Sequence, residues 1–96
     1  MSYKKGRSYE EETVRIARGH GKKMSREALS GQKLNPDLWL EIPKWGCEIA
    51  IEQKVRKNGF KRIYKWLEGK DALIIKGIGV GKRLIVIEFE RFLNLI

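Results

Sequence analysis

Two carboxylates and a lysine stand at the edges of two apolar segments that are typical of neighbouring strands. Asp37 precedes the run LWLEI, and Glu52 and Lys54 follow the run CEIAI. The segment PKWG lies between the two runs, and its proline and glycine predict a turn, so the runs are expected to form an antiparallel hairpin. In that hairpin Asp37 lies near the end of the partner strand. The three charged groups would therefore meet at one point.

Two carboxylates at one point repel each other unless a hard cation accepts their oxygen atoms as ligands. Mg²⁺ is such a cation, and Mn²⁺ is expected to substitute for it. A bound Mg²⁺ activates a water molecule and bridges to a phosphate oxygen, and a lysine beside it can orient that water or stabilise transition-state charge. The pattern therefore predicts phosphodiester hydrolysis. The alternative is that Asp37 opens a turn, and that Glu52 and Lys54 pair with each other at the solvated end of a strand.

The charge balance favours a polyanionic partner, either nucleic acid or an acidic membrane surface. The 96 residues carry 21 Lys and Arg against 12 Asp and Glu, a formal net charge of +9 at pH 7. The alternative for such charge runs is an ordinary solvated face. Cations flank the charged groups described above on both sides in the sequence, which favours contacts to DNA phosphates. These cations are Lys4, Lys5, Arg7, Lys22, Lys23, Arg26, Lys33, Arg56, Lys57, Lys61, Arg62 and Lys65.

The elements that must position these residues can be predicted from local patterns. Ser8 with Glu11 predicts a capping box at the start of a helix that the segment GHG ends. Residues 22–35 predict a short strand followed by a loop. The hairpin comes next, and after the segment RKNG the apolar residues from Phe60 to Leu67 recur at helical spacing.

Two more strands, ALIIK and RLIVIE, are joined by GIGVGK, and a helical stripe of apolar residues closes the chain. The order αβββαββα predicts an α/β fold in one domain over residues 1–96. The closing stripe is a large apolar face for so small a domain, and a partner subunit is the simplest cover for it, which predicts a homodimer. The stripe consists of Phe89, Phe92, Leu93 and Ile96.

Further features of the sequence limit which functions are expected. Cys47 lies within an apolar alternating run, which predicts a small core residue, and a single cysteine fits a reducing compartment. No apolar run approaches the roughly 20 residues of a membrane span, so a cytoplasmic protein without a membrane partner is expected. The segment KGIGVGK lacks the first glycine and the final Ser or Thr of a Walker loop, so no nucleotide cofactor is expected.

Pro36 and Asp37, followed after a turn by Glu52 and Lys54, resemble the PD-(D/E)xK nuclease motif. The segment KKGRSYEEETVRIARGHG resembles the opening of the archaeal-type Holliday junction resolvases, and LSG ahead of the aspartate and AIEQK followed by VRK are similar to the same family. The resemblance covers nearly the whole chain. It implies a restriction-endonuclease-like fold with a mixed sheet flanked by helices, a homodimer, and Mg²⁺-dependent paired, symmetric nicking of four-way DNA junctions.

The resemblance also implies residue roles. Asp37 and Glu52 would be metal ligands, and Lys54 the catalytic lysine. Glu10 would add a third metal-site carboxylate from the first helix. Ser30 matches a serine that the family uses near the scissile phosphate.

Three consecutive glutamates leave Glu11 and Glu12 as alternatives to Glu10. The chain departs from the family at Gln53, where an apolar residue is usual, and in being shorter than typical members. Its compact size suggests a viral or phage version, which would act in the host cytoplasm. Two other functions stay open: a less structure-selective nuclease of the same superfamily in DNA repair or replication, and a non-catalytic basic DNA-binding module.

Overall fold

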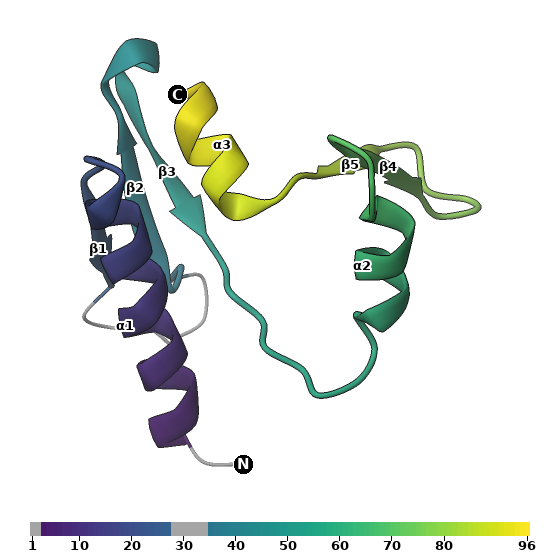
Figure 1. Cartoon of the computed structure of the whole chain (residues 1–96), viewed down its shortest axis with the longest axis horizontal. Coiled ribbons are helices and arrows are strands. Elements are labelled where there is room, and N and C mark those ends of the chain that lie inside the picture. Colours follow the sequence, from purple (N-terminus) through teal and green to yellow (C-terminus); the bar gives the residue numbers. More distant parts are fainter. Residues whose placement is uncertain (1–2, 28–34) are drawn as a thin grey trace. The chain divides into compact units, whose positions relative to one another are not determined.

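A computed structural model describes residues 3–27 and 35–96, with side chains from Arg7 onward (Figure 1). The protein is of the mixed α/β class, as predicted, and it divides into two compact units: Met1–Val55 with Ile96, and Arg56–Leu95. The described strands pair only with their sequence neighbours and form two antiparallel sheets, β1-β2-β3 and β4-β5. No parallel ladder occurs among the described strands, so the single mixed sheet stays a prediction.

Helix α1 spans Tyr3–Gly19 and begins earlier than predicted. Ser8 lies inside this helix, so the prediction that it caps the N-terminus was wrong. The helix continues through Ser8, and the charged residues on either side of it stabilise this turn, since Arg7 and Glu11 lie one turn apart and form an ion pair of 3.7 Å. Such pairs stabilise a helix by a few tenths of a kcal/mol, about 0.2 to 0.5.

The predicted end of this helix at GHG is confirmed. The N–H of Lys22 donates to the carbonyl of Ala17 (3.0 Å), and the N–H of Gly21 donates to that of Arg18 (3.0 Å). These two bonds form a Schellman motif, which requires a left-handed residue at the position of Gly21. Gly21 has a φ of 75° and meets that requirement without a steric penalty.

The first unit has a meander of three strands, β1 Met24–Arg26, β2 Leu38–Ile42 and β3 Cys47–Ile51. The inward side chains of β2 alternate with its outward ones, as the period of a strand requires. α1 contacts β1, and it lies beside the sheet in Figure 1. Burying each large aliphatic side chain stabilises the fold by about 1.5 to 3 kcal/mol. The core consists of Val14, Ala17, Met24, Leu38, Leu40 and Ile42.

The hairpin between β2 and β3 is confirmed. Its turn is a short 3-10 helix, η1 Pro43–Trp45, and Gly46 follows with a φ of 69° and donates its N–H to the carbonyl of Pro43. Cys47 is exposed, so its predicted place in the core was wrong. It is the first residue of an edge strand next to the turn, where few side chains are available to cover it.

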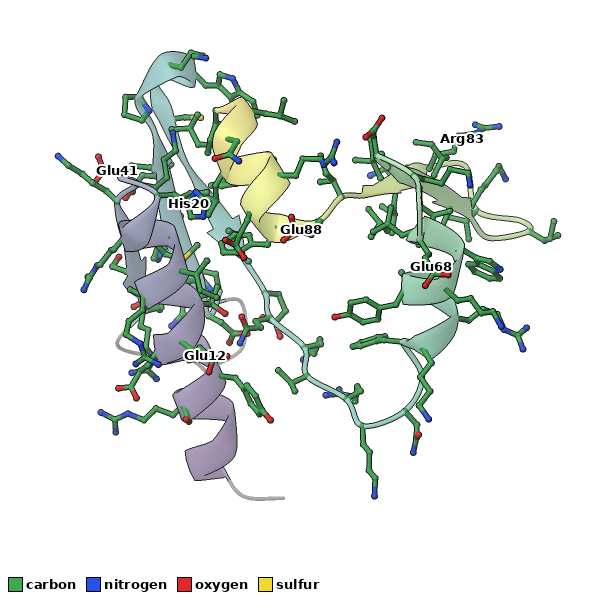
Figure 2. All side chains as sticks on the ribbon, viewed as in Figure 1. Glu12, His20, Glu41, Glu68, Arg83 and Glu88 are labelled. Carbon is green, nitrogen blue, oxygen red and sulfur yellow. The ribbon has the colours of Figure 1, made fainter. Side chains whose placement is uncertain are left out.

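The second unit contains α2 Lys61–Leu67, β4 Leu73–Lys76, β5 Arg83–Val86 and α3 Phe89–Leu95. Glu88, labelled in Figure 2, caps α3, because its carboxylate accepts the N–H groups of Glu90 (2.9 Å) and Arg91 (3.0 Å). Arg91 also forms an ion pair with Asp71 just before β4. These contacts connect the start of α3 with the segment before β4. No helix within residues 3–27 and 35–96 has the length and apolarity needed to cross a membrane.

Candidate active site

Asp37 occupies a bend just before β2 and is 8% exposed. Its N–H donates to the carbonyl of Ile51 (2.9 Å), and its own carbonyl accepts the N–H of Glu27 (3.0 Å). Its side-chain oxygen Oδ2 accepts the N–H of Gln53 (2.8 Å). Asp37 therefore connects the end of β1 with the segment that follows β3. Since Leu38 pairs with Ile51, continuing that register by one residue sets Asp37 opposite Glu52.

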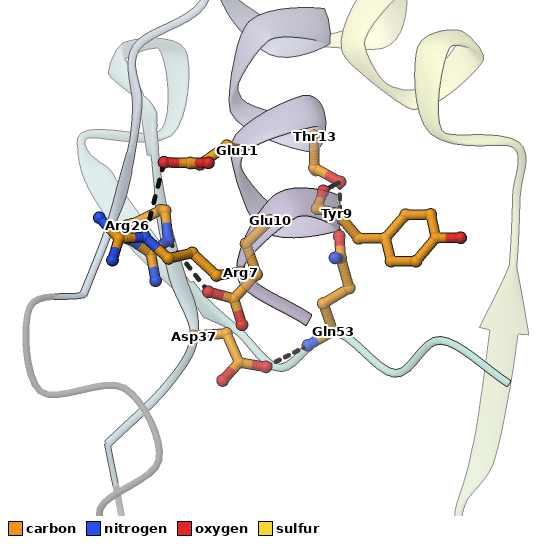
Figure 3. A network of polar contacts seen from close by, with 8 residues as sticks. All are labelled: Arg7, Tyr9, Glu10, Glu11, Thr13, Arg26, Asp37 and Gln53. Atoms are coloured by element: carbon orange, nitrogen blue, oxygen red, sulfur yellow. Dashed lines mark hydrogen bonds and ion pairs between the residues drawn. The ribbon is translucent and has the colours of Figure 1, made fainter. Parts of the chain in front are cut away.

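Glu10 is the glutamate of α1 that turns toward the sheet. Its side chain is 13% exposed, and its Oε1 lies 3.1 Å from Nε of Arg26, which is itself 29% exposed. Arg26 pairs with Leu38 in the ladder, next to Asp37 in the chain, so Glu10 and Asp37 lie at the same end of the sheet (Figure 3). Glu11 and Glu12 are exposed. The geometry thus distinguishes Glu10 from the two glutamates that follow it.

Glu52 and Lys54 lie beyond the last paired residue of β3. Lys54 Nζ is 2.8 Å from Glu52 Oε2, and the two side chains are 55% and 54% exposed. An exposed pair of this kind contributes at most about 1 kcal/mol. In this arrangement the two residues pair with each other, as the solvated-end alternative expected, while the side chain of Asp37 binds the N–H of Gln53.

Within the described part of the chain, no three His, Cys, Asp or Glu side chains gather closely enough to hold a metal ion. Two ion pairs explain this arrangement, since Glu10 is neutralised by Arg26 and Glu52 by Lys54. The donor chemistry nevertheless fits a hard cation. Glu10 and Asp37 offer carboxylate oxygens from α1 and from the start of β2, and Glu52 follows β3 by a single residue. Oxygen donors of this type are those that Mg²⁺ prefers.

Gln53 and Thr13 contribute to this end of the sheet although sequence reasoning gave them no role there. Oε1 of Gln53 lies 2.5 Å from Oγ1 of Thr13, and that hydroxyl also lies 3.0 Å from the carbonyl of Tyr9. A hydroxyl has one hydrogen and can donate to one of these oxygens at a time. The available signal was Gln53 itself, which stands where the motif that the sequence resembles usually has an apolar residue, since a polar side chain at a half-buried position needs a partner.

The predicted DNA-contact residues have different environments. Arg7 and Arg26 are in ion pairs with glutamates of α1, and Lys22 donates to the carbonyl of Ile96 (2.7 Å). Ser30 and Lys33 lie outside the described residues, as do the side chains of Lys4 and Lys5. The other predicted cations are exposed: Lys23, Arg56, Lys57, Lys61, Arg62 and Lys65.

A groove of about 320 Å³ lies in the first unit, and it contains two of the predicted DNA-contact residues. The indole N–H of Trp39 at its wall donates to Glu27 Oε1 (2.9 Å), which holds the ring in place. Arg18 adds a cation that the sequence pattern did not single out. The groove is lined by Arg18, Lys22, Lys23, Met24, Ser25, Trp39, Glu41 and Glu48.

Comparisons of the chain with protein-family models, with curated proteins and with solved structures find no significant match.

Proposed function

We propose that this chain is a Mg²⁺-dependent endonuclease with a restriction-endonuclease-like core, and that it acts as a homodimer to resolve four-way DNA junctions by paired nicks. One observation supports the proposal above all. Asp37 is hydrogen-bonded directly to the segment Glu52–Lys54 through the N–H of Gln53, and Glu10 lies at the same end of the sheet. The motif that the sequence resembles joins the same residue types across the same two strands.

The residues suited to hold the cation are Glu10, Asp37 and Glu52. When bound, the cation supplies an activated water and neutralises phosphate charge. Lys54 is suited to place its ammonium beside the reacting phosphate once Glu52 turns away from it. Arg26 has the opposite effect, because its ion pair with Glu10 competes with any cation for the same oxygen.

A non-catalytic basic DNA-binding module is the second candidate. The specific observation in its favour is that both charged partners, Arg26 and Lys54, already neutralise the carboxylates that a cation would use. A module of this kind keeps the cations that bind phosphate and needs no divalent ion. Under either candidate, a single domain over residues 1–96 and a cytoplasmic location stay predictions.

The proposed function is tested by incubating the protein with a synthetic four-way junction, a linear duplex and a flap, with and without Mg²⁺. We expect Mg²⁺-dependent cleavage of the junction in preference to the other two substrates. Glu52→Gln and Lys54→Ala should each lower cleavage by at least about a hundredfold while junction binding is kept. Glu68→Gln is the matched control, since Glu68 is an exposed carboxylate at the end of α2 outside the proposed site, and it should cleave normally.

The outcomes separate the candidates. Equal cutting of all three substrates would indicate the less structure-selective nuclease of the same superfamily. Junction binding without cleavage in Mg²⁺ or Mn²⁺, unchanged by Glu52→Gln, would indicate the non-catalytic module. Mn²⁺ is expected to replace Mg²⁺ in an active enzyme.

A further inference from the structure

The loop between β4 and β5 is a closed turn that presents an apolar side chain at its tip. Val80 donates its N–H to the carbonyl of Gly77 (3.1 Å), and Gly79 has a φ of 83°, as the third position of a type II turn requires. Nζ of Lys76 donates to the carbonyls of Gly77 (3.2 Å) and Val80 (2.7 Å). These bonds define the conformation of residues 77–80.

Ile78 is 100% exposed at this tip, and Val80 is 52% exposed. A single exposed apolar side chain is common and has no meaning alone. Here the surrounding charge is informative, because no acidic residue occurs between Asp71 and Glu88. The charged residues of this stretch are all cations, namely Lys76, Lys82 and Arg83.

Two of these cations oppose each other. Lys76 pairs with Arg83 at the last rung of the β4-β5 ladder, and Arg83 is labelled on this hairpin in Figure 2. Like charges directly opposite on neighbouring strands destabilise a hairpin. A polyanion bound at the base of the tip would remove this repulsion.

We propose that the 77–80 turn is a wedge for distorted DNA, in which Ile78 inserts between bases while the cations at its base bind the adjacent phosphates. Proteins that bend or open DNA use isoleucine and similar apolar side chains in this way. The branch point of a junction is a favourable place, because the strands exchange between helices there and the continuity of base stacking is already interrupted, which lowers the cost of unstacking. This inference rests on the proposed DNA substrate and names the contact that would recognise its distortion.

DNA fits the tip better than a lipid surface does. Membrane binding scales with the apolar area that enters the bilayer, and this turn offers one fully exposed aliphatic side chain and one half-exposed one. A wedge between two bases needs no more than one such side chain.

The test uses the full chain and a four-way junction that carries 2-aminopurine beside the branch point, without divalent cations so that no strand is cut. Binding of the wild-type protein should raise the fluorescence of 2-aminopurine as it unstacks. Ile78→Ser should abolish that rise and weaken junction binding about tenfold, while binding to a linear duplex changes less than twofold. Ile85→Ser is the matched control, because it removes a 65% exposed isoleucine from β5, and it should behave as wild type.

Several results would overturn the wedge. These are an unchanged fluorescence rise in Ile78→Ser, equal losses in Ile78→Ser and Ile85→Ser, or wild-type binding without any rise. In each of those cases junction binding by the wild type would leave the proposed DNA function standing. The wild type can also be tested for binding to vesicles of phosphatidylcholine and phosphatidylserine. If it binds them, if Ile78→Ser abolishes that binding, and if the fluorescence of 2-aminopurine does not change, the tip binds lipid instead. A wild-type protein that binds no junction at all would overturn the proposed function itself.

Discussion

At the scale of single residues, the environment of Asp37 explains why an aspartate stands before an apolar strand. Its carboxylate is nearly buried and accepts the N–H of Gln53, a backbone donor beyond the end of β3. A hydrogen bond to an ionised acceptor is stronger than a neutral one and contributes about 1.5 to 3 kcal/mol. The residue thus stabilises the hairpin end whether or not it also binds a cation.

Substitution of Asp37 can separate these two roles. Asp37→Asn keeps an oxygen that can accept the Gln53 N–H, so we expect the free energy of unfolding to fall by about 1 kcal/mol or less. Asp37→Ala removes the acceptor and should cost about 2 to 3 kcal/mol. Urea unfolding measures both values, and cleavage assays should show that both variants are inactive. Full activity of Asp37→Asn would restrict this residue to its structural role.

The ion pair between Arg26 and Glu10 is the second residue-scale feature that can be tested. Arg26→Ala leaves the carboxylate of Glu10 largely shielded from water without its cation, and we expect a loss of about 1 to 2 kcal/mol in unfolding free energy. Arg7→Ala is the control, since it breaks an exposed pair with Glu11 and should cost less than about 0.5 kcal/mol. Glu10→Gln combined with Arg26→Ala should recover part of the loss. Equal effects of the two arginine substitutions would show that the burial of Glu10 has no energetic consequence.

At the scale of elements, local signals define where the helices and strands stop. The Schellman motif after α1 and the turn at Gly46 both depend on glycine in a left-handed conformation. The carboxylate of Glu88 starts α3 by accepting two N–H groups. These caps and turns depend on residues that are close in the sequence, and each can be tested without a functional assay.

The glycine at the end of α1 provides such a test. Gly21→Ala forces a side chain into a φ of 75° and should destabilise the protein by about 1 to 2 kcal/mol. Gly19→Ala is the matched control, because Gly19 has helical geometry and open space around its Cα. It should leave stability unchanged or raise it by up to about 1 kcal/mol. Thermal unfolding followed by circular dichroism compares the two, and similar effects of both would contradict the assigned cap.

At the scale of the whole molecule, the chain combines two compact units with a net charge of +9. The carboxylates of the candidate site all lie in the first unit, whereas α2 of the second unit carries three exposed cations, Lys61, Arg62 and Lys65. The cations of α2 are suited to bind the phosphates of a polyanion. DNA binding should therefore weaken steeply as the salt concentration rises.

Removing two of these cations tests this interpretation. Lys61→Ala with Arg62→Ala should weaken DNA binding and reduce the slope of log affinity against log salt by about 2, because each phosphate contact contributes roughly 0.9 to that slope. The control combines Lys44→Ala with Arg15→Ala, which removes the same residue types from exposed positions outside the predicted contact set. Fluorescence anisotropy over a range of salt concentrations gives both slopes. Equal slopes for the two double variants would mean that α2 only adds general positive charge.

The sequence by itself determined the class of the fold, the hairpin around PKWG and the end of α1. These features depend on periodicity and on glycine and proline within a few residues, so they are encoded locally. Only the tertiary structure decided that Glu10 rather than Glu11 or Glu12 turns toward the sheet, that Gln53 meets Thr13, and that Glu52 pairs with Lys54. It also decided the exposure of Cys47 and the division of the strands into two sheets. The physical reason is that burial and side-chain pairing depend on contacts between segments that are distant in the sequence. The apolar periodicity of a single helix or strand does not specify those contacts.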